Sequence, residues 1–140
     1  MSTTESCKSR WRINKNERLR EIRSLWATYQ LGGETDAEVG CSIYEYGLCF
    51  DYVPSDEDRP GRPGYWRWQL SWGGPSDELR FFADSPNSKC WAIEYAFLDW
   101  YDGHSRRLTG KDFALLAEIW QEFFVESGAA RAAFENEMDQ

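Results

Sequence analysis

The chain of 140 residues carries 24 Asp and Glu against 16 Lys and Arg, and 16% of its residues are aromatic. This aromatic content excludes the composition of a disordered protein, and the length suits one domain with its own hydrophobic core. A net charge of −8 argues against a protein that mainly neutralises nucleic-acid phosphates, because such binding depends on clustered Lys and Arg.

The N-terminal residues bear on the cellular compartment of the protein and on where its folded domain begins. Residues 1–9 are polar and lack the apolar segment of a secretory signal. The chain also has no run approaching the roughly 20 apolar residues of a membrane span. We therefore expect a cytoplasmic protein, with a flexible basic N-terminus over residues 1–13 and a single domain over residues 14–140.

The first predicted element is a helix that begins at Asn14 or Asn16 and ends at Gly32-Gly33. Asparagine is a favoured N-cap, and glycine readily adopts the left-handed conformation that ends many helices. The apolar residues between these limits recur at steps of three and four, which is the period of a helix with one buried face. They are Leu19, Ile22, Trp26 and Tyr29.

Two stretches then alternate apolar and polar side chains, residues 44–52 and residues 66–72. A period of two is typical of a strand with one face toward the core. In the second stretch three tryptophans share a face with Leu70, which favours a buried face over an exposed platform for stacking nucleic-acid bases. The segment 54–64 between the two stretches is rich in turn-forming residues.

The predicted sheet continues with shorter strands. A hairpin loop at residues 73–76 leads into a third strand over residues 78–83, and a fourth strand covers residues 91–101. Asp102-Gly103 is a strong hairpin signal, so we expect a fifth strand over residues 104–108.

The C-terminal part of the chain has a helical period. Thr109 is the candidate N-cap, Ser127-Gly128 ends the helix, and a shorter helix follows over residues 129–138. The elements together predict an α+β fold, an antiparallel meander of four or five strands flanked by an N-terminal and a C-terminal helix. The apolar arc of the longer helix contains Phe113, Leu116, Ile119, Trp120, Phe123 and Phe124.

The cysteines do not form a metal-binding pattern. Their spacing is irregular, with no Cys-x-x-Cys pair, and His104 is the only histidine that could join them. We expect free thiols, no metal and no cofactor, because the chain also lacks glycine-rich nucleotide-binding motifs. The cysteines are Cys7, Cys41, Cys49 and Cys90.

The negative charge is concentrated in two segments. Residues 1–31 have a net charge of +4 and residues 59–107 of +1, whereas residues 32–58 carry −8 and residues 108–140 carry −5. These acidic segments are either a solvated surface or a docking surface for a Lys- and Arg-rich groove. As partner-binding residues we predict Glu34, Asp36, Glu38, Asp56, Glu57, Asp58, Glu118, Glu122 and Glu126.

One cluster offers groups for acid–base chemistry. Glu94, Asp99 and His104 lie near the end of the fourth predicted strand and its turn. A small hydrolase could use His104 with Asp99 or Glu94. No local signature of a nucleophile accompanies them, so we predict no catalytic residue and treat the hydrolase as an alternative.

Residues 65–82 and 93–103, with the run Tyr-Trp-Arg-Trp-Gln-Leu-Ser-Trp-Gly-Gly-Pro-Ser, resemble small acidic proteins of bacterial phages and conjugative elements. The resemblance extends over residues 65–108. It implies a mobile-element context, in which such proteins often inhibit host defence, as anti-CRISPR and antirestriction proteins do. A strong DNA mimic is not expected, because a duplex has one charge per about 1.7 Å of axis.

The sequence therefore predicts a non-enzymatic binding protein of a mobile element that inhibits a host CRISPR or restriction complex through its acidic surface. The expected partner is a protein complex with a basic groove of the kind that holds a nucleic-acid backbone. Neither a membrane nor direct binding of nucleic acid is expected. The alternatives are an immunity or antitoxin protein that neutralises a cognate toxin, and the small hydrolase.

Overall fold

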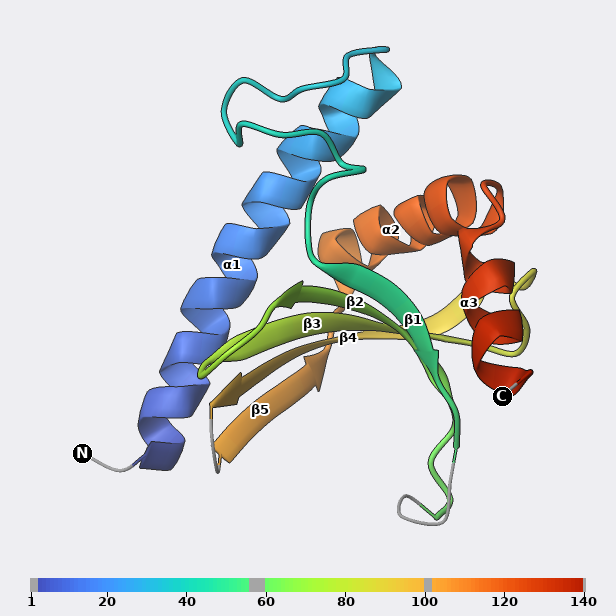
Figure 1. The fold of residues 1–140 in the computed structure, drawn as a ribbon. Coiled ribbons are helices and arrows are strands. Elements are labelled where there is room, and N and C mark those ends of the chain that lie inside the picture. The colour runs from blue at the N-terminus through green and yellow to red at the C-terminus, as the bar shows by residue number, and fades with distance from the viewer. Residues whose placement is uncertain (1–2, 56–59, 100–101, 140) are drawn as a thin grey trace.

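The computed structural model describes residues 3–55, 60–99 and 102–139 of the chain, and the side chains from Lys8 onward within these ranges. Figure 1 shows a five-stranded antiparallel sheet in the order β1-β2-β3-β4-β5, with a long N-terminal helix and C-terminal helices. This confirms the predicted α+β meander. The elements are α1 (Thr3–Gln30), β1 (Cys49–Val53), β2 (Tyr65–Ser71), β3 (Ser76–Ala83), β4 (Cys90–Asp99), β5 (Asp102–Arg107), α2 (Gly110–Ile119), the π-helical turn η1 (Trp120–Val125) and α3 (Ala129–Met138).

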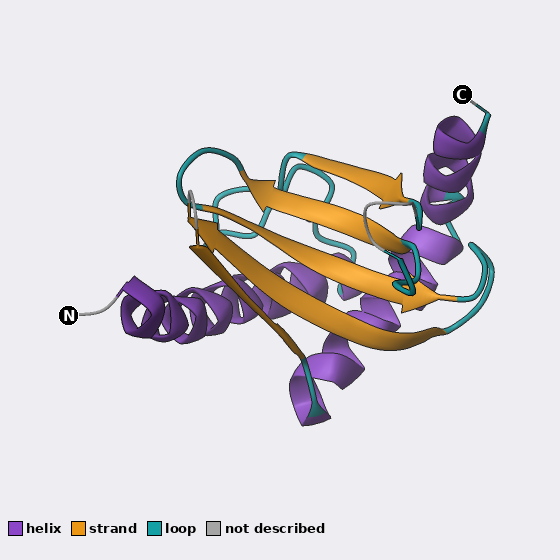
Figure 2. Cartoon of the chain, turned by 90° about the horizontal axis from the view of Figure 1, so that it is seen from below, coloured by secondary structure: helices purple, strands orange, loops and turns teal. Residues whose placement is uncertain are grey.

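The helices pack on one face of the sheet, and the core lies between the two layers (Figure 2). Alternate residues of β2, β3 and β4 point toward the helices, as the period of two predicts. Buried aromatic rings fill much of this layer, and each removes about 150–250 Å² from water. No described helix covers the opposite face. Among the described residues, no helix has the length and apolar character needed to cross a membrane.

Helix α1 begins earlier than the sequence predicts. It starts at Thr3 instead of Asn14 or Asn16, so the part of the expected flexible segment that the structure describes is helical. Tertiary contacts explain the difference: Trp11 is buried and donates from its indole nitrogen to the carbonyl of Tyr95 at 2.7 Å. Arg10, the residue before Trp11, forms an ion pair with Asp99.

The strand predicted over residues 44–52 is shorter in the structure. It begins at Cys49, and the residues before it form turns. Gly47 has φ +82°, and a Cβ there would lie 2.8 Å from the indole nitrogen of Trp68. The chain therefore bends at Gly47, and Tyr44 is 70% exposed instead of facing the core.

Two further details of the sheet differ from the predictions. The pairing of β2 with β3 shifts between Gln69 and Ser71, and β2 ends there, so Trp72 is 65% exposed instead of buried. Asp102-Gly103 is not the turn: Asp102 pairs with Asp99, so both residues already belong to β5. The end of the predicted fourth strand, residues 100–101, lies outside the described residues.

Candidate functional site

Three segments that are distant in the sequence meet beyond the sheet, at the C-terminal end of α1. They are the end of α1, the loop 32–48 and η1, which lie at the same end of the molecule in Figure 1. Their contact is aromatic. The ring centroid of Tyr29 lies 5.8 Å from that of Tyr44 and 5.7 Å from that of Phe123, and Tyr44 and Phe123 are 5.0 Å apart.

Exposed carboxylates surround this aromatic cluster. Glu118 accepts a hydrogen bond from the indole nitrogen of Trp26 at 2.7 Å, which places the helical acidic stripe beside the end of α1. The pKa of the Tyr29 hydroxyl is raised by its hydrogen bond to Tyr44 and, to a smaller extent, by the charges of Glu126 and Glu122. We call this region the acidic end, defined by Glu34, Glu45, Glu118, Glu122 and Glu126 with Tyr29, Tyr44 and Phe123.

A hollow of about 430 Å³ opens at the acidic end. Tyr29 and Tyr44 line it together with the buried side chain of Ile43, and Glu34 and Glu45 contribute its carboxylates. Aromatic faces attract cations, and nearby carboxylates attract them through their opposite charge. This combination suits a Lys or Arg side chain of a partner.

The structure brings only some of the predicted acidic residues to this end. Asp36 is a structural residue: it is 4% exposed, and its carboxylate accepts hydrogen bonds from Ser24, Thr28 and two backbone N–H groups of its own loop. Its prediction as a partner-binding residue is therefore wrong. Glu38 is exposed but lies 3.9 Å from Arg20 on α1. Residues 56–58, with Asp56, Glu57 and Asp58, lie outside the described residues.

We expect the hydrogen bonds of Asp36 to make stability depend on pH in the acid range. Those from Ser24 and Thr28, followed by the backbone, lower its pKa from 3.8 to about 2. A depressed carboxyl pKa stabilises the folded state fully above the unfolded pKa, and this stabilisation is lost as the pH falls through about 2. Chemical denaturation of wild type and Asp36→Asn between pH 3.8 and about 2 checks this pH dependence. The free energy of unfolding of wild type should fall more steeply with decreasing pH than that of the variant. Parallel curves for the two proteins would contradict it.

The alternative hydrolase site is not assembled as the sequence suggested. Glu94 lies on the open face of the sheet beside Arg80, whereas His104 packs against Trp11 on the helix-covered face, with ring centroids 5.5 Å apart. Asp99 is held by Arg10. The pKa of His104 is lowered by burial and by the nearby Arg106 and Lys8 charges.

The three cysteine thiols that the structure describes are not activated as nucleophiles. Cys41, Cys49 and Cys90 are free, and burial is the main cause that raises the pKa of each, that of Cys90 to about 11. A reactive cysteine needs a lowered pKa. In the described part of the chain, no group of three or more His, Cys, Asp and Glu residues could hold a metal ion.

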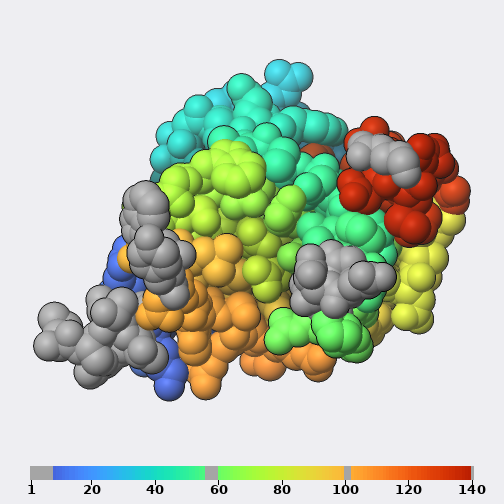
Figure 3. Space-filling model, turned by 60° about the horizontal axis from the view of Figure 1, so that its bottom comes forward, coloured from blue at the N-terminus to red at the C-terminus, as the bar shows by residue number. Residues whose placement is uncertain are grey.

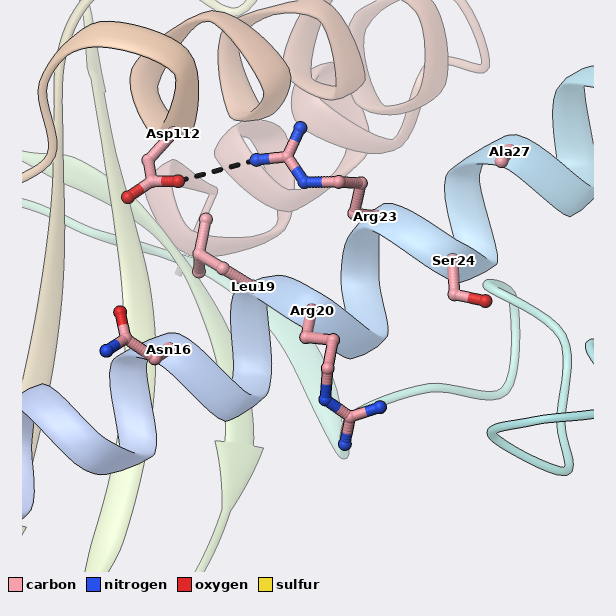
Figure 4. A pocket seen from close by; sticks show the side chains of 7 residues that line it. All are labelled: Asn16, Leu19, Arg20, Arg23, Ser24, Ala27 and Asp112. Carbon is pink, nitrogen blue, oxygen red and sulfur yellow. Dashed lines mark hydrogen bonds and ion pairs between the residues drawn. The ribbon is translucent and has the colours of Figure 1, made fainter.

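A larger groove of about 490 Å³ runs along α1 beside the start of α2 (Figure 4). Its charges are compensated within the molecule, because Arg23 contacts Asp112 at 3.4 Å and Arg20 lies 3.9 Å from Glu38. Its one hydroxyl, that of Ser24, is bound to Asp36 at 2.7 Å. The groove thus presents fewer free groups than the acidic end.

The aromatic residues of the acidic end were missed from the sequence, because the periodicity assigned Tyr29, Tyr44 and Phe123 to core faces. A comparison of the chain with protein-family models, with curated proteins and with solved structures found no match. The significance of the acidic end therefore follows from its geometry and charge. The sequence did contain one indication of this site: Tyr44 lies in an acidic segment that contains no Lys or Arg.

Proposed function

We propose that the chain is a non-enzymatic binding protein whose acidic end docks on a basic surface of a partner protein. The observation that carries this proposal is the folding of two separate acidic segments around an exposed tyrosine, Tyr44. Aromatic anchors surrounded by charged residues are typical of protein interfaces. Complementary charge also steers association and selects the partner.

The partner we propose is a host defence complex, of the CRISPR or restriction type, with a basic groove that normally holds nucleic acid. The resemblance to small acidic proteins of mobile elements supports this choice. The acidic end contributes only a few carboxylates around an aromatic cluster, which favours docking on protein over imitation of a whole duplex. An inhibitor of this kind acts by occupying the groove or its entrance.

The test is binding to a purified host defence complex, measured by calorimetry at two salt concentrations. We expect the double variant Glu122→Lys/Glu126→Lys to bind at least about tenfold more weakly than wild type, because like charges then face each other. The matched control is Glu17→Lys/Asp84→Lys, which changes the net charge equally at two exposed positions elsewhere. Tyr44→Ala should also weaken binding.

Two results would overturn the proposal. If wild type binds no defence complex, the proposed partner is wrong. If the control variant loses as much affinity as the acidic-end variant, net charge and not this surface determines binding. Higher salt should weaken the wild-type complex more than the complex of the acidic-end variant, because screening acts on exposed charges.

A further inference from the structure

The open face of the sheet carries a row of charged residues, one from each strand. The strand register places them side by side, and Figure 3 shows the strands of this face, green to orange, at the surface. Arg67 binds Asp51 through two hydrogen bonds of 2.6 and 3.0 Å. Arg80 binds Glu78 at 2.8 Å and lies 4.0 Å from Glu94. In strand order the row is Asp51, Arg67, Arg80, Glu94 and Arg107.

Arg107, at the end of this row, does not follow the pattern. It is paired in register with Glu94, but no carboxylate of the described residues lies within 4.0 Å of its guanidinium. The guanidinium lies instead over the ring of Trp91, 5.7 Å from the centroid. If the row of charged residues served only to keep this face of the sheet soluble, Arg107 would be expected to form an ion pair with Glu94.

Beside the row lies an aromatic cluster that is separate from the main core. Phe82 is in contact with Tyr65 and with Trp91, at centroid distances of 5.5 and 5.4 Å. Tyr65 and Phe82 are buried, whereas Trp91 is 47% exposed. The cluster therefore presents a large flat ring to solvent on a rigid strand.

These groups line a pocket of about 340 Å³. Arg62, from the loop before β2, provides a third guanidinium beside Arg80 and Arg107, and Glu94 is the only carboxylate among the described residues that line the pocket. Arg62, like Arg107, has no ion pair with a described residue. Within a chain of net charge −8, the described residues that line this pocket thus carry three positive charges and one negative charge.

We propose that this pocket binds a nucleotide, with the base stacked on Trp91 and the phosphate held by Arg62 and Arg107. Guanidinium groups bind phosphate through paired hydrogen bonds, and nucleic-acid bases stack on exposed aromatic side chains. Pockets for small ligands start at about 300 Å³, so the volume suits one nucleotide unit. A carboxylate ligand without a ring would leave Trp91 exposed. This site is independent of the acidic end.

The test is calorimetric titration of the full chain with adenosine monophosphate, adenosine and inorganic phosphate. We expect the monophosphate to bind at least about tenfold more tightly than either fragment, because only the whole nucleotide engages both the ring and the guanidiniums. A short single-stranded oligonucleotide identifies the source: tighter binding than the monophosphate indicates a nucleic-acid strand, and weaker binding indicates a free nucleotide.

Matched variants test the assignment. Arg107→Gln and Trp91→Ala should each reduce binding of the monophosphate at least about tenfold, whereas Trp91→Phe should retain most of it. The control is Arg106→Gln, since Arg106 is the exposed neighbour that points to the other face, beside His104. Unfolding curves show that the variants are folded. No binding of the monophosphate, or equal losses for Arg106→Gln and Arg107→Gln, would overturn the proposal.

Discussion

Replacing Asp77 with alanine is expected to lower the free energy of unfolding by about 3–5 kcal/mol, the usual cost of removing one partner from a buried ion pair. Asp77 is 2% exposed. Its carboxylate accepts two hydrogen bonds from the Arg18 guanidinium, at 2.8 and 3.1 Å. It also accepts one from the hydroxyl of Ser71 and one from that of Tyr95, both at 2.6 Å. One carboxylate thus joins α1 to three strands.

The loss is large because the partners stay behind without their acceptor. Burial opposes the charge of Arg18, but hydrogen bonds to Asp77 and Tyr46 outweigh burial and raise the pKa of its guanidinium. Burial, followed by the hydrogen bond to Asp77, also raises the pKa of Tyr95. In Asp77→Ala a partly buried cation and a buried hydroxyl lose their acceptor, and each carries a desolvation cost.

Urea denaturation measures this difference, with Asp51→Ala as the matched control. The Asp51 carboxylate also accepts two hydrogen bonds from an arginine, Arg67, but its side chain is 42% exposed. Asp51→Ala should therefore lower the free energy of unfolding by less than about 1 kcal/mol. The double variant Arg18→Met/Asp77→Leu should recover part of the loss, since apolar side chains leave no unpaired charge. Equal losses for Asp77→Ala and Asp51→Ala would contradict the role assigned to burial.

Local patterns predicted the elements of this fold that bury one face. The alternation around Trp66 and Trp68 identified β2 because only a strand points those rings to one side. The break at Ser127-Gly128 likewise located the end of the longer helix, and α3 has the predicted bounds, Ala129–Met138. In each case neighbouring residues carry the information.

The errors have tertiary causes. Nothing near Trp11 in the sequence indicates that its indole binds the carbonyl of Tyr95, the contact that anchors the first turns of α1. The composition identified the acidic segments, but the aromatic contact between Tyr44 and Phe123 that joins them spans most of the chain. For Asp36, the charge predicted an exposed residue, whereas its hydrogen-bond partners on α1 bury it.

Replacing Trp120 with alanine is expected to destabilise the protein by about 3–5 kcal/mol, because a large buried ring leaves a cavity that the core cannot fill. The ring of Trp120 is fully buried where η1 meets the sheet. It stacks on Phe81 at 5.5 Å and meets Trp66 edge-on at 5.1 Å. Its indole nitrogen donates to the carbonyl of Ser88 at 2.9 Å, so the ring also ties the loop between β3 and β4 to the core.

Two other tryptophan substitutions separate these contributions in thermal and urea denaturation. Trp120→Phe keeps an aromatic ring but loses the hydrogen bond to Ser88, so it should cost less than Trp120→Ala, and the difference between the two variants measures the packing. Trp72→Ala should change the free energy of unfolding by less than about 0.5 kcal/mol, because the Trp72 ring is exposed and does not pack in the core. A similar loss for Trp72→Ala and Trp120→Ala would place Trp72 in the core, and the end of β2 at Ser71 would then be wrong.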